Sequence, residues 1–385
     1  MGPGWRCWDR EEEGAGAKRS GVGLSIGIVG LPNAGKSSLF NALTRASVAV
    51  ASYPFTTIEP HHGVVAVPDP RIAAVAAVTH PERTVPVTVE FIDIAGLVRG
   101  ASRGEGLGNQ FLAHIREVQA LAHVVRCFES PDVPHVEGGM DPIRDIEIVE
   151  TELALADLAT VEREIERARS RLRAHDAQAE QDLQRLTAVS ESLQRGVPAR
   201  RLADDRDRGA LIRPFRLLTA KPVLYVANVA ETDLPAGGAA AARVRQHAQA
   251  SHAEVLVLAA RLEAEAAALP EDEAMEFLRA YELEGSGLSM LARTAYRLLD
   301  LVTFFSTASK EVRAWSVPRG TTAPEAAGQI HTDMERGYIK AEVINWEALM
   351  RAGSLKAAHD RGLVRLEGKE YVVQDGDVVL FRFAT

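Results

Sequence analysis

Apolar positions along the chain form short runs separated by longer amphipathic stretches. The short runs have the length of single strands and lie at residues 25–29, 87–92, 122–128, 223–227 and 255–258. Such runs indicate strands that are buried on both faces, and the stretches between them are long enough for crossover helices. The pattern therefore predicts an α/β fold with a doubly wound, mostly parallel sheet.

About ninety residues separate the third run from the fourth, which is far more than a connection needs. Apolar positions there step by four and three, first at Ala154, Leu158, Val161, Ile165, Ala168 and Leu172, then at Ala179, Leu183, Leu186, Ser190 and Leu193. The two series flank a break near His175 and Asp176. They predict two short heptad helices that form an inserted antiparallel hairpin at residues 139–210. The charge run 162–173 reads as its solvated face.

The pattern changes again near residue 301. Short β-rich segments lie at residues 302–307, 312–317, 339–344, 371–373 and 378–383, with a helical stretch at 323–330. They predict a small, ubiquitin-like α+β domain at residues 301–385. Residues 1–21 alternate glycine with charge and predict a disordered extension, which leaves 22–138 and 211–300 for the parallel-sheet domain.

Composition narrows the function classes. The formal net charge of -9 excludes a generally basic nucleic-acid surface, so we expect no DNA partner and only local contacts with RNA. No apolar run approaches the ~20 residues of a membrane span, and the first 20 residues lack the apolar centre of a signal peptide. Two cysteines are too few for a disulfide framework or a thiolate metal site. We therefore expect a cytoplasmic protein.

The strongest chemical signal is G-L-P-N-A-G-K-S at residues 30–37, which matches the phosphate loop G-x-x-x-x-G-K-[ST] between a strand and a helix. Its glycines let backbone N–H groups and the helix N-terminus face phosphates. Lys36 would neutralise the β and γ charge during catalysis, and Ser37 would offer its hydroxyl to Mg²⁺. The alternative to a phosphate-binding site is a chance match of the motif in a loop that is only structural.

Asp93 and Gly96 form a D-x-x-G motif at the end of the strand 87–92. In this order after a phosphate loop, the carboxylate helps to hold Mg²⁺, through water where it is not a direct ligand, and the glycine N–H senses the γ-phosphate. Thr57 in the intervening loop is the candidate for the second Mg²⁺ hydroxyl. The alternative is a capping threonine and a strand-end aspartate. The glycine-rich segment 100–108 reads as the mobile switch.

Leu97 stands where many switch hydrolases place the glutamine that orients the attacking water. An apolar side chain cannot do this, so another side chain or a monovalent cation beside the phosphates positions the water, or else intrinsic turnover is slow. His123 begins a buried strand and His114 lies in a helical pattern, whereas His135 lies in a loop that is free to close on a nucleotide. We therefore assign the catalytic role to His135.

Base selection should come from the segment after the strand 223–227, which reads Asn228, Val229, Ala230, Glu231. Guanine-specific hydrolases place N-K-x-D there. The longer Glu231 replaces the aspartate that pairs with guanine, and Val229 replaces the lysine whose stem covers the base. Selectivity of this kind depends on satisfied buried hydrogen bonds. The segment therefore favours relaxed or ATP-directed specificity.

The chain resembles the YchF or Obg-like ATPase family in four motifs: G-L-P-N-A-G-K-S-S-L-F-N-A-L-T, Y-P-F-T-T-I-E-P, D-I-A-G-L-V-R-G-A-S-R-G-E-G-L-G-N and N-V-A-E. The segments K-E-V-R-A-W, A-A-G-Q-I-H-T-D and V-Q-D-G-D-V-V-L-F-R-F resemble the family's C-terminal TGS domain. The resemblance implies a Mg²⁺-dependent P-loop ATPase of the translation-factor class that prefers ATP to GTP. It also implies association with ribosomal RNA and proteins and a part in stress regulation.

Residue by residue, the resemblance places Mg²⁺ hydroxyls on Ser37 and Thr57, the catalytic histidine on His135 and base recognition on Asn228 and Val229. ATP phosphates fall on the loop residues Asn33, Ala34, Gly35, Lys36, Ser37 and Ser38. An asparagine at position 33 is associated with K⁺ in related hydrolases, so a K⁺ requirement is a hypothesis. A GTPase of the same architecture, or a ribosome-binding module in which nucleotide is only structural, are the alternatives.

Overall fold

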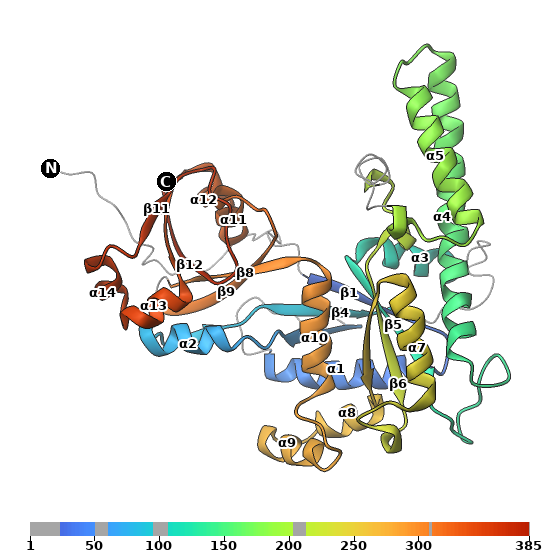
Figure 1. Ribbon diagram of the computed structural model, residues 1–385, viewed down its shortest axis with the longest axis horizontal. Helices are drawn as coiled ribbons and strands as arrows, with labels where there is room; N and C mark the ends of the chain where they lie inside the picture. The colour runs from blue at the N-terminus through green and yellow to red at the C-terminus, as the bar shows by residue number, and fades with distance from the viewer. Residues whose placement is uncertain (1–23, 51–60, 95–106, 203–212, 308–309, 385) are drawn as a thin grey trace. The chain divides into compact units, whose positions relative to one another are not determined.

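The computed structural model describes residues 24–50, 61–94, 107–202, 213–307 and 310–384 of the 385-residue chain. They form two compact units (Figure 1). The first unit contains residues 24–65 and 89–299, and the second contains 66–88 and the segment from residue 300 onward. The expected extension at 1–21 lies outside the described residues.

The first unit is built on a six-stranded sheet with the order β2-β4-β1-β5-β6-β7. Its strands are β1 (Leu24–Val29), β2 (His62–Ala66), β4 (Thr88–Asp93), β5 (Ala120–Cys127), β6 (Val223–Val229) and β7 (Glu254–Leu258). The pairs β1–β4, β1–β5, β5–β6 and β6–β7 are all parallel, which confirms the predicted sheet. β2 was not predicted, and the five other strands begin and end within two residues of the expected runs.

Helices surround this sheet and explain why its strands are so apolar. They are α1 (Lys36–Val50), α3 (Leu107–Glu117), α4 (Pro142–Arg173), α5 (Ala179–Gln194), α7 (Gly238–Ser251), α8 (Ala260–Ala266), α9 (Glu271–Arg279) and α10 (Gly287–Leu298). Every residue of β5 and β6 is buried, because helices cover both faces of a doubly wound sheet. The parallel strands all end at the carboxyl edge of the sheet, where ligands of doubly wound folds bind. The loop after β1 begins at this edge.

The predicted hairpin is formed by α4 and α5, which meet at the expected break near His175 (Figure 1). Most of its heptad positions, among them Val161, Ile165 and Leu186, lie in one buried cluster between the two helices, whereas the predicted position Leu172 is 39% exposed. The expectation of two short helices was wrong for α4, which has 32 residues. Its first half carries Ile146 and Val149 into the core of the sheet, and so does not follow the heptad pattern of its second half.

The root of the hairpin is fixed by buried polar contacts. Asp157 of α4 is fully buried, and its carboxylate accepts hydrogen bonds from the backbone N–H groups of Leu218 and Thr219 at 2.7 and 2.8 Å. The Thr219 hydroxyl donates to the same carboxylate at 2.7 Å. Two turns earlier on the same helix, Glu150 accepts a hydrogen bond from the Tyr225 hydroxyl at 2.8 Å. These contacts join α4 to β6 and to the short 3₁₀ helix η4 (Leu218–Ala220).

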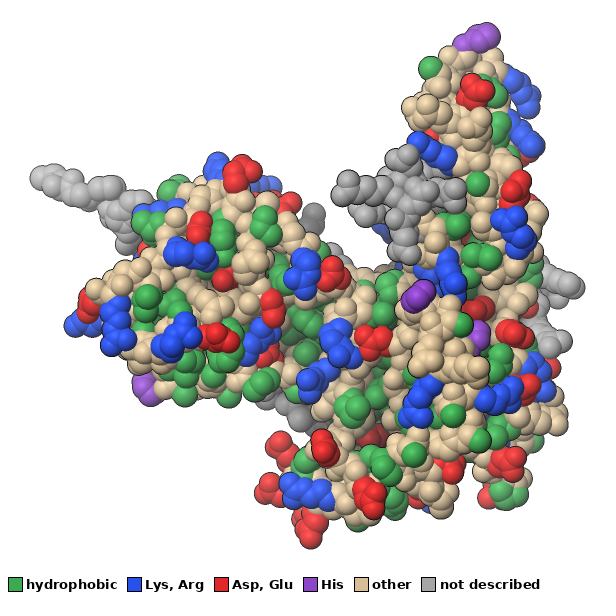
Figure 2. Space-filling view, viewed as in Figure 1, with side chains coloured by type: hydrophobic (Ala, Val, Ile, Leu, Met, Phe, Trp, Pro, Cys, Tyr) green, Lys and Arg blue, Asp and Glu red, His purple; other side chains and the backbone are tan. Residues whose placement is uncertain are grey.

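The predicted charged face of the hairpin is exposed. Arg167 and Arg169 pair with glutamates three residues earlier, and both arginine side chains are more than half exposed. Figure 2 shows basic and acidic side chains interspersed along this arm. Pairs of this kind on an exposed helix contribute little to stability, which agrees with a solvated face.

The second unit is a mixed sheet with helices packed beside it. Its strands, in the order β11-β10-β12-β8-β9-β3, are β11 (Arg365–Glu367), β10 (Tyr338–Asn345), β12 (Asp377–Phe383), β8 (Leu301–Ser306), β9 (Glu311–Pro318) and β3 (Arg83–Val85). The helices are α2 (Pro70–Thr79), α11 (Ala323–Ile330), α12 (Thr332–Arg336), α13 (Trp346–Ala352) and α14 (Leu355–Asp360). The helix expected at 323–330 is α11.

Two features of the second unit differ from the expectations. Residues 66–88 were expected in the parallel-sheet domain, but β3 pairs in parallel with β9, so that Arg83 lies opposite Glu311. The segment 371–373 is not a strand. Its backbone instead contacts the start of α11, where the Ala323 N–H donates to the Tyr371 carbonyl at 2.8 Å. Among the described residues, no helix is long and apolar enough to cross a bilayer.

Candidate functional site

The phosphate-loop motif occupies the turn between β1 and α1, where the sequence places it. Gly30 has φ of 148° and Gly35 has φ of 98°, positive backbone angles that residues with a Cβ atom rarely adopt. A Cβ atom on Gly30 would lie 2.4 Å from the Val124 carbonyl oxygen, and one on Gly35 would lie 2.0 Å from Nδ2 of Asn228. Both positions need glycine, and the bare backbone leaves room for a phosphate to approach.

Lys36 and Asp93 place opposite charges at this carboxyl edge. Lys36 begins α1, is 8% exposed, and donates from Nζ to the Leu31 carbonyl oxygen at 2.8 Å. Burial lowers the pKa of Lys36, and attraction to Asp93 opposes that shift. Burial likewise raises the pKa of Asp93, which ends β4, while Lys36 and His61 oppose the rise. Each ion is thus costly by itself, and a bound polyphosphate with its metal ion would compensate both.

The donors present fit Mg²⁺. Ser37 and Ser38 lie in the first turn of α1 with exposed side chains, and Asp93 supplies a carboxylate. One or two protein oxygens together with substrate phosphates are the usual Mg²⁺ ligands, and Ser37 and Asp93 are the described residues that would hold it. Thr57, Gly96 and Leu97 lie outside the described residues. So does the segment 100–108, except for its last two residues, which begin α3.

Asn228 is a brace between two loops of the site. It is 4% exposed, and its Nδ2 donates to the Ala34 carbonyl at 2.9 Å. Its Oδ1 accepts from the backbone N–H of Ala260, at the start of α8, also at 2.9 Å. The side chain therefore positions the phosphate loop, and only the second amide hydrogen and the second lone pair of Oδ1 can serve a base.

The other base-recognition candidates offer few polar groups. Val229 ends β6 and is 3% exposed, with its side chain in the core of the first unit, so its backbone is what it can present to a base. Glu231 opens the 3₁₀ helix η5 (Glu231–Asp233) and lies 3.6 Å from the guanidinium of Arg261. This arginine side chain is 81% exposed and also hydrogen-bonds Glu265 at 3.2 Å, so its pairing with the carboxylate in the guanine-binding position is a weak surface contact.

The loop that carries His135 is held at several points. Arg126, near the end of β5, donates to the carbonyl oxygens of Val133 at 2.7 Å and Phe128 at 3.1 Å. Asn33 of the phosphate loop donates from Nδ2 to the Pro134 carbonyl at 3.1 Å. The residue preceding His135 is therefore in direct contact with the phosphate loop, which brings His135 to the site.

The His135 ring itself is enclosed. Its Nε2 lies 2.7 Å from Oδ2 of Asp145, and its Nδ1 lies 3.0 Å from the backbone nitrogen of Glu137. The His135 and Asp145 side chains are 8% and 5% exposed. The sequence predicted a loop free to close on a nucleotide. The structure corrects this for the conformation described, because β5, α4 and the phosphate loop all contribute contacts that hold the loop.

The two other histidines considered lie where the sequence places them. His123 in β5 is 3% exposed, and burial lowers its pKa to about 4, so it stays uncharged at neutral pH. His114 is exposed on α3. Sequence reasoning missed Arg126 and Asp145. A lone arginine in the apolar strand β5 was a usable signal, whereas an acidic residue in the first turn of a helix is expected from the helix dipole alone and gives none.

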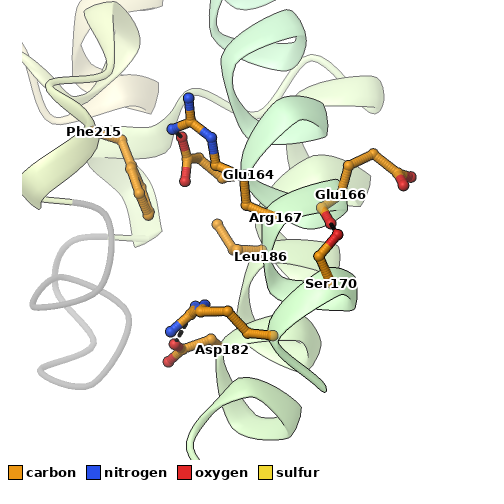
Figure 3. Close-up of a pocket in the computed structure, with 8 residues that line it drawn as sticks. Glu164, Glu166, Arg167, Ser170, Asp182, Leu186 and Phe215 are labelled. Atoms are coloured by element: carbon orange, nitrogen blue, oxygen red, sulfur yellow. Dashed lines mark hydrogen bonds and ion pairs between the residues drawn. The ribbon is translucent and has the colours of Figure 1, made fainter. Parts of the chain in front are cut away.

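The hairpin carries a second concave surface, a groove of about 590 Å³ between α4 and α5. Figure 3 shows Leu186 and Phe215 beside charged side chains from both helices. These charges neutralise one another, since Arg171 binds Asp182 at 2.8 Å and Arg167 binds Glu164. The groove therefore offers a small ligand no uncompensated charge, in contrast to the phosphate loop.

Comparisons with known proteins agree with this site. The family model described as 50S ribosome-binding GTPase matches residues 25–156, and the YchF-GTPase_C model, described as a protein of unknown function (DUF933), matches residues 301–384. The chain is 47% identical to the ribosome-binding ATPase YchF of Bacillus subtilis, covering 94% of this chain and 100% of the relative. It is 50% identical to that of Haemophilus ducreyi, covering 94% and 99%.

A solved structure is similar over the same extent. The YchF GTPase of Schizosaccharomyces pombe superposes with a TM-score of 0.83 at 32% identity and covers 97% of this chain and 100% of that one. These matches extend over nearly the whole length of this chain and of the relatives. The chain belongs to the YchF family of P-loop nucleoside triphosphatases.

Proposed function

We propose that the chain is a Mg²⁺-dependent ATPase that hydrolyses ATP to ADP and phosphate as a conformational switch on the ribosome. The observation that carries the ATP preference is the base segment after β6. Val229 is buried in place of a lysine stem, and Glu231 lies 3.6 Å from Arg261. A base segment with a longer glutamate in place of the guanine-pairing aspartate, and with no lysine stem to cover the base, loses its main means of preferring GTP. An adenine amine needs only a backbone carbonyl, which the segment around Val229 can supply.

In this proposal the hydrolytic step transfers the γ-phosphoryl group to water. A water oxygen attacks the γ-phosphorus, the bond to the β–γ bridging oxygen breaks, ADP leaves, and the proton that the water loses passes to the phosphate product or to solvent. Lys36 neutralises charge on the phosphates, while Ser37 and Thr57 would hold Mg²⁺ together with Asp93, which would act directly or through water. The metal, when bound, offsets charge on the β- and γ-oxygens. His135 accepts a hydrogen bond from the attacking water, the role for which Leu97 is unsuited, and Gly96 senses the γ-phosphate.

The proposed partner is the ribosome, through its RNA and proteins, which would place the chain in the cytoplasm. Support comes from the relatives of Bacillus subtilis and Haemophilus ducreyi, which are named ribosome-binding ATPases. A part in stress regulation belongs to the same proposal. The second candidate function is a GTPase of the same architecture, which the name of the similar Schizosaccharomyces pombe protein favours.

Equilibrium binding of ATP and of GTP with Mg²⁺, measured by calorimetry on the full chain, tests the base preference. ATP should bind at least tenfold more tightly, a difference of about 1.4 kcal/mol. A tenfold preference for GTP would overturn the ATPase assignment in favour of the GTPase. Hydrolysis should follow the same order, because the phosphate site is shared by both nucleotides.

Lys36→Ala separates a switch from a module in which nucleotide is only structural. Hydrolysis should be lost, and ribosome binding measured by co-sedimentation should no longer respond to ATP. Lys369→Ala is the matched control, because Lys369 is exposed in the second unit. If Lys36→Ala binds ribosomes as the wild type does with and without ATP, the switch is refuted. Equal hydrolysis rates in K⁺ and Na⁺ buffers would dispose of the hypothesis that K⁺ acts near Asn33.

A further inference from the structure

Asp145 is a buried carboxylate whose short contact is with the candidate catalytic histidine. It lies in the first turn of α4, behind the N-cap Asp141, whose side chain accepts from the N–H of Ile143 at 3.2 Å. The Asp145 side chain is 5% exposed, and Oδ2 lies 2.7 Å from Nε2 of His135. Its other oxygen lies 3.5 Å from the guanidinium of Arg144. Because the helix fixes its backbone, Asp145 holds the ring in one place.

The hydrogen bonds of His135 also fix where its ring proton lies. The backbone N–H of Glu137 points at Nδ1 at 3.0 Å, so Nδ1 is the acceptor and carries no hydrogen. The ring hydrogen is then on Nε2, where the Asp145 carboxylate accepts it. A carboxylate that accepts from one ring nitrogen leaves the lone pair on the other, as in the histidine–carboxylate pairs of hydrolytic enzymes.

We propose that Asp145 is a positioning residue for hydrolysis: it keeps the proton of His135 on Nε2 and thereby presents Nδ1 as the atom that accepts a hydrogen bond from the attacking water. The proposal rests on the role of His135 proposed above. In the conformation described, the Glu137 N–H occupies Nδ1. The water takes the place of this N–H, which requires a shift of the backbone at Glu137 but no break of the contact between His135 and Asp145.

A purely structural pair would look the same in a static structure, because a buried carboxylate needs a partner in any case. The two roles differ in what else they predict. If Asp145 only anchors the loop that carries His135, its replacement should affect folding and nucleotide affinity. A positioning residue should affect kcat through His135, and it should set the tautomer of that one ring.

The tautomer is tested by ¹⁵N NMR of the full chain labelled at histidine, with the His135 signals assigned from the spectrum of His135→Gln. The wild type should show one fixed tautomer with hydrogen on Nε2. Asp145→Ala should give the averaged signals of an exchanging ring, and Asp145→Asn should retain part of the fixed signal, because an amide oxygen can still accept. A wild-type ring with hydrogen on Nδ1, or an unchanged ring in Asp145→Ala, overturns the proposal.

Steady-state hydrolysis of ATP with Mg²⁺ gives the functional readout. Asp145→Ala should lower kcat about tenfold or more, the usual effect of losing the partner that orients a histidine, with the Kd for ADP unchanged within twofold. Asp145→Asn should fall between this variant and the wild type. Asp132→Ala is the matched control, because it removes an exposed carboxylate from the same loop and should leave kcat unchanged. A rise in kcat for Asp145→Ala would show that Asp145 holds His135 in an inactive position, and it would overturn the proposal.

A double-mutant cycle decides whether Asp145 acts through His135. Adding Asp145→Ala to His135→Gln should cause no further loss of kcat, whereas an undiminished loss would show a structural role and refute the proposal. If the wild type hydrolyses ATP and His135→Gln is as fast, the ATPase stands and the assignment of both residues fails. If the wild type hydrolyses no ATP, the proposed function fails, and the NMR result still decides whether Asp145 sets the tautomer.

Discussion

Replacing Asn228 with alanine should destabilise the first unit and loosen the phosphate loop. The change leaves two buried backbone groups without partners, the carbonyl of Ala34 and the N–H of Ala260, each of which now contacts the Asn228 amide at 2.9 Å. A buried polar group that loses its partner costs about 1–3 kcal/mol, so the two together should cost about 2–6 kcal/mol of unfolding free energy. The side chain is 4% exposed, which leaves little access for water to replace it.

Urea unfolding followed by far-UV circular dichroism measures this loss, and hydrogen exchange at the Ala260 amide locates it. Asn345→Ala is the matched control. Asn345 is exposed in the second unit and caps α13 with one hydrogen bond, to the Glu347 N–H at 2.9 Å. That variant should lose only about 1 kcal/mol and leave exchange at Ala260 unchanged. A loss below about 0.5 kcal/mol in Asn228→Ala, with Ala260 still protected, would refute the brace.

Asn228→Asp sharpens the same test, because it keeps the acceptor for Ala260 and removes only the donor to Ala34. The new carboxylate would face a carbonyl oxygen in a buried site, so its pKa in the folded state should rise above the unfolded value of about 3.9. A raised pKa means that the destabilisation is complete at neutral pH and shrinks as the pH falls through the folded value, where the acid can donate to Ala34 again. Stability that does not recover on acidification, relative to the wild type, would contradict the reasoning.

Two further predictions follow from the same unit. Gly35→Ala should weaken ATP binding at least tenfold in calorimetry, because a Cβ there lies 2.0 Å from Nδ2 of Asn228 and φ is 98°; wild-type affinity would show that the loop does not need this conformation. Burial lowers the pKa of His123 to about 4, below the unfolded value near 6.5. The folded state therefore resists protonation, and unfolding free energy should fall by about 2 kcal/mol between pH 7 and pH 5 on this account. In His123→Phe that part of the fall should be absent, and an unchanged pH dependence would refute the assignment.

Local sequence signals predicted the parallel sheet well, because each of its central strands is apolar on both faces. The phosphate loop was predictable for a similar reason, since its glycines, Lys36 and Ser37 lie within eight residues between a strand and a helix. Segments that fold through distant partners were not. β3 has three residues and acquires its place from β9, more than two hundred residues later, so no local period marks it. The segment 371–373 is composed of β-prone residues like a strand, but it forms only an isolated bridge to Thr322 at the start of α11.

In the candidate site, too, local sequence motifs predicted some residues, whereas contacts between separate elements could not be predicted. Residues identified by motif, such as Lys36 and Asp93, lie together at the carboxyl edge of the sheet, and Asn228 joins them as a brace. The surroundings of His135 could not be read from the chain, because Asn33 and Asp145 reach its loop from other elements. A pattern gives the type of a side chain and its element, whereas the partner of a buried polar group depends on which elements meet.

Helix α4 carries acidic residues on its buried side, and each of them indicates a tertiary contact. Its heptad period describes only the half that packs against α5, and the other half carries the buried acids Asp145, Glu152 and Asp157 among apolar neighbours. A carboxylate on the inward face of a helix must have a partner, so each such acid indicates a tertiary contact even when its partner is unknown. Asp145 meets His135 and Asp157 meets Thr219. The helix that forms the longer arm of the hairpin is therefore also the wall that holds the candidate catalytic histidine.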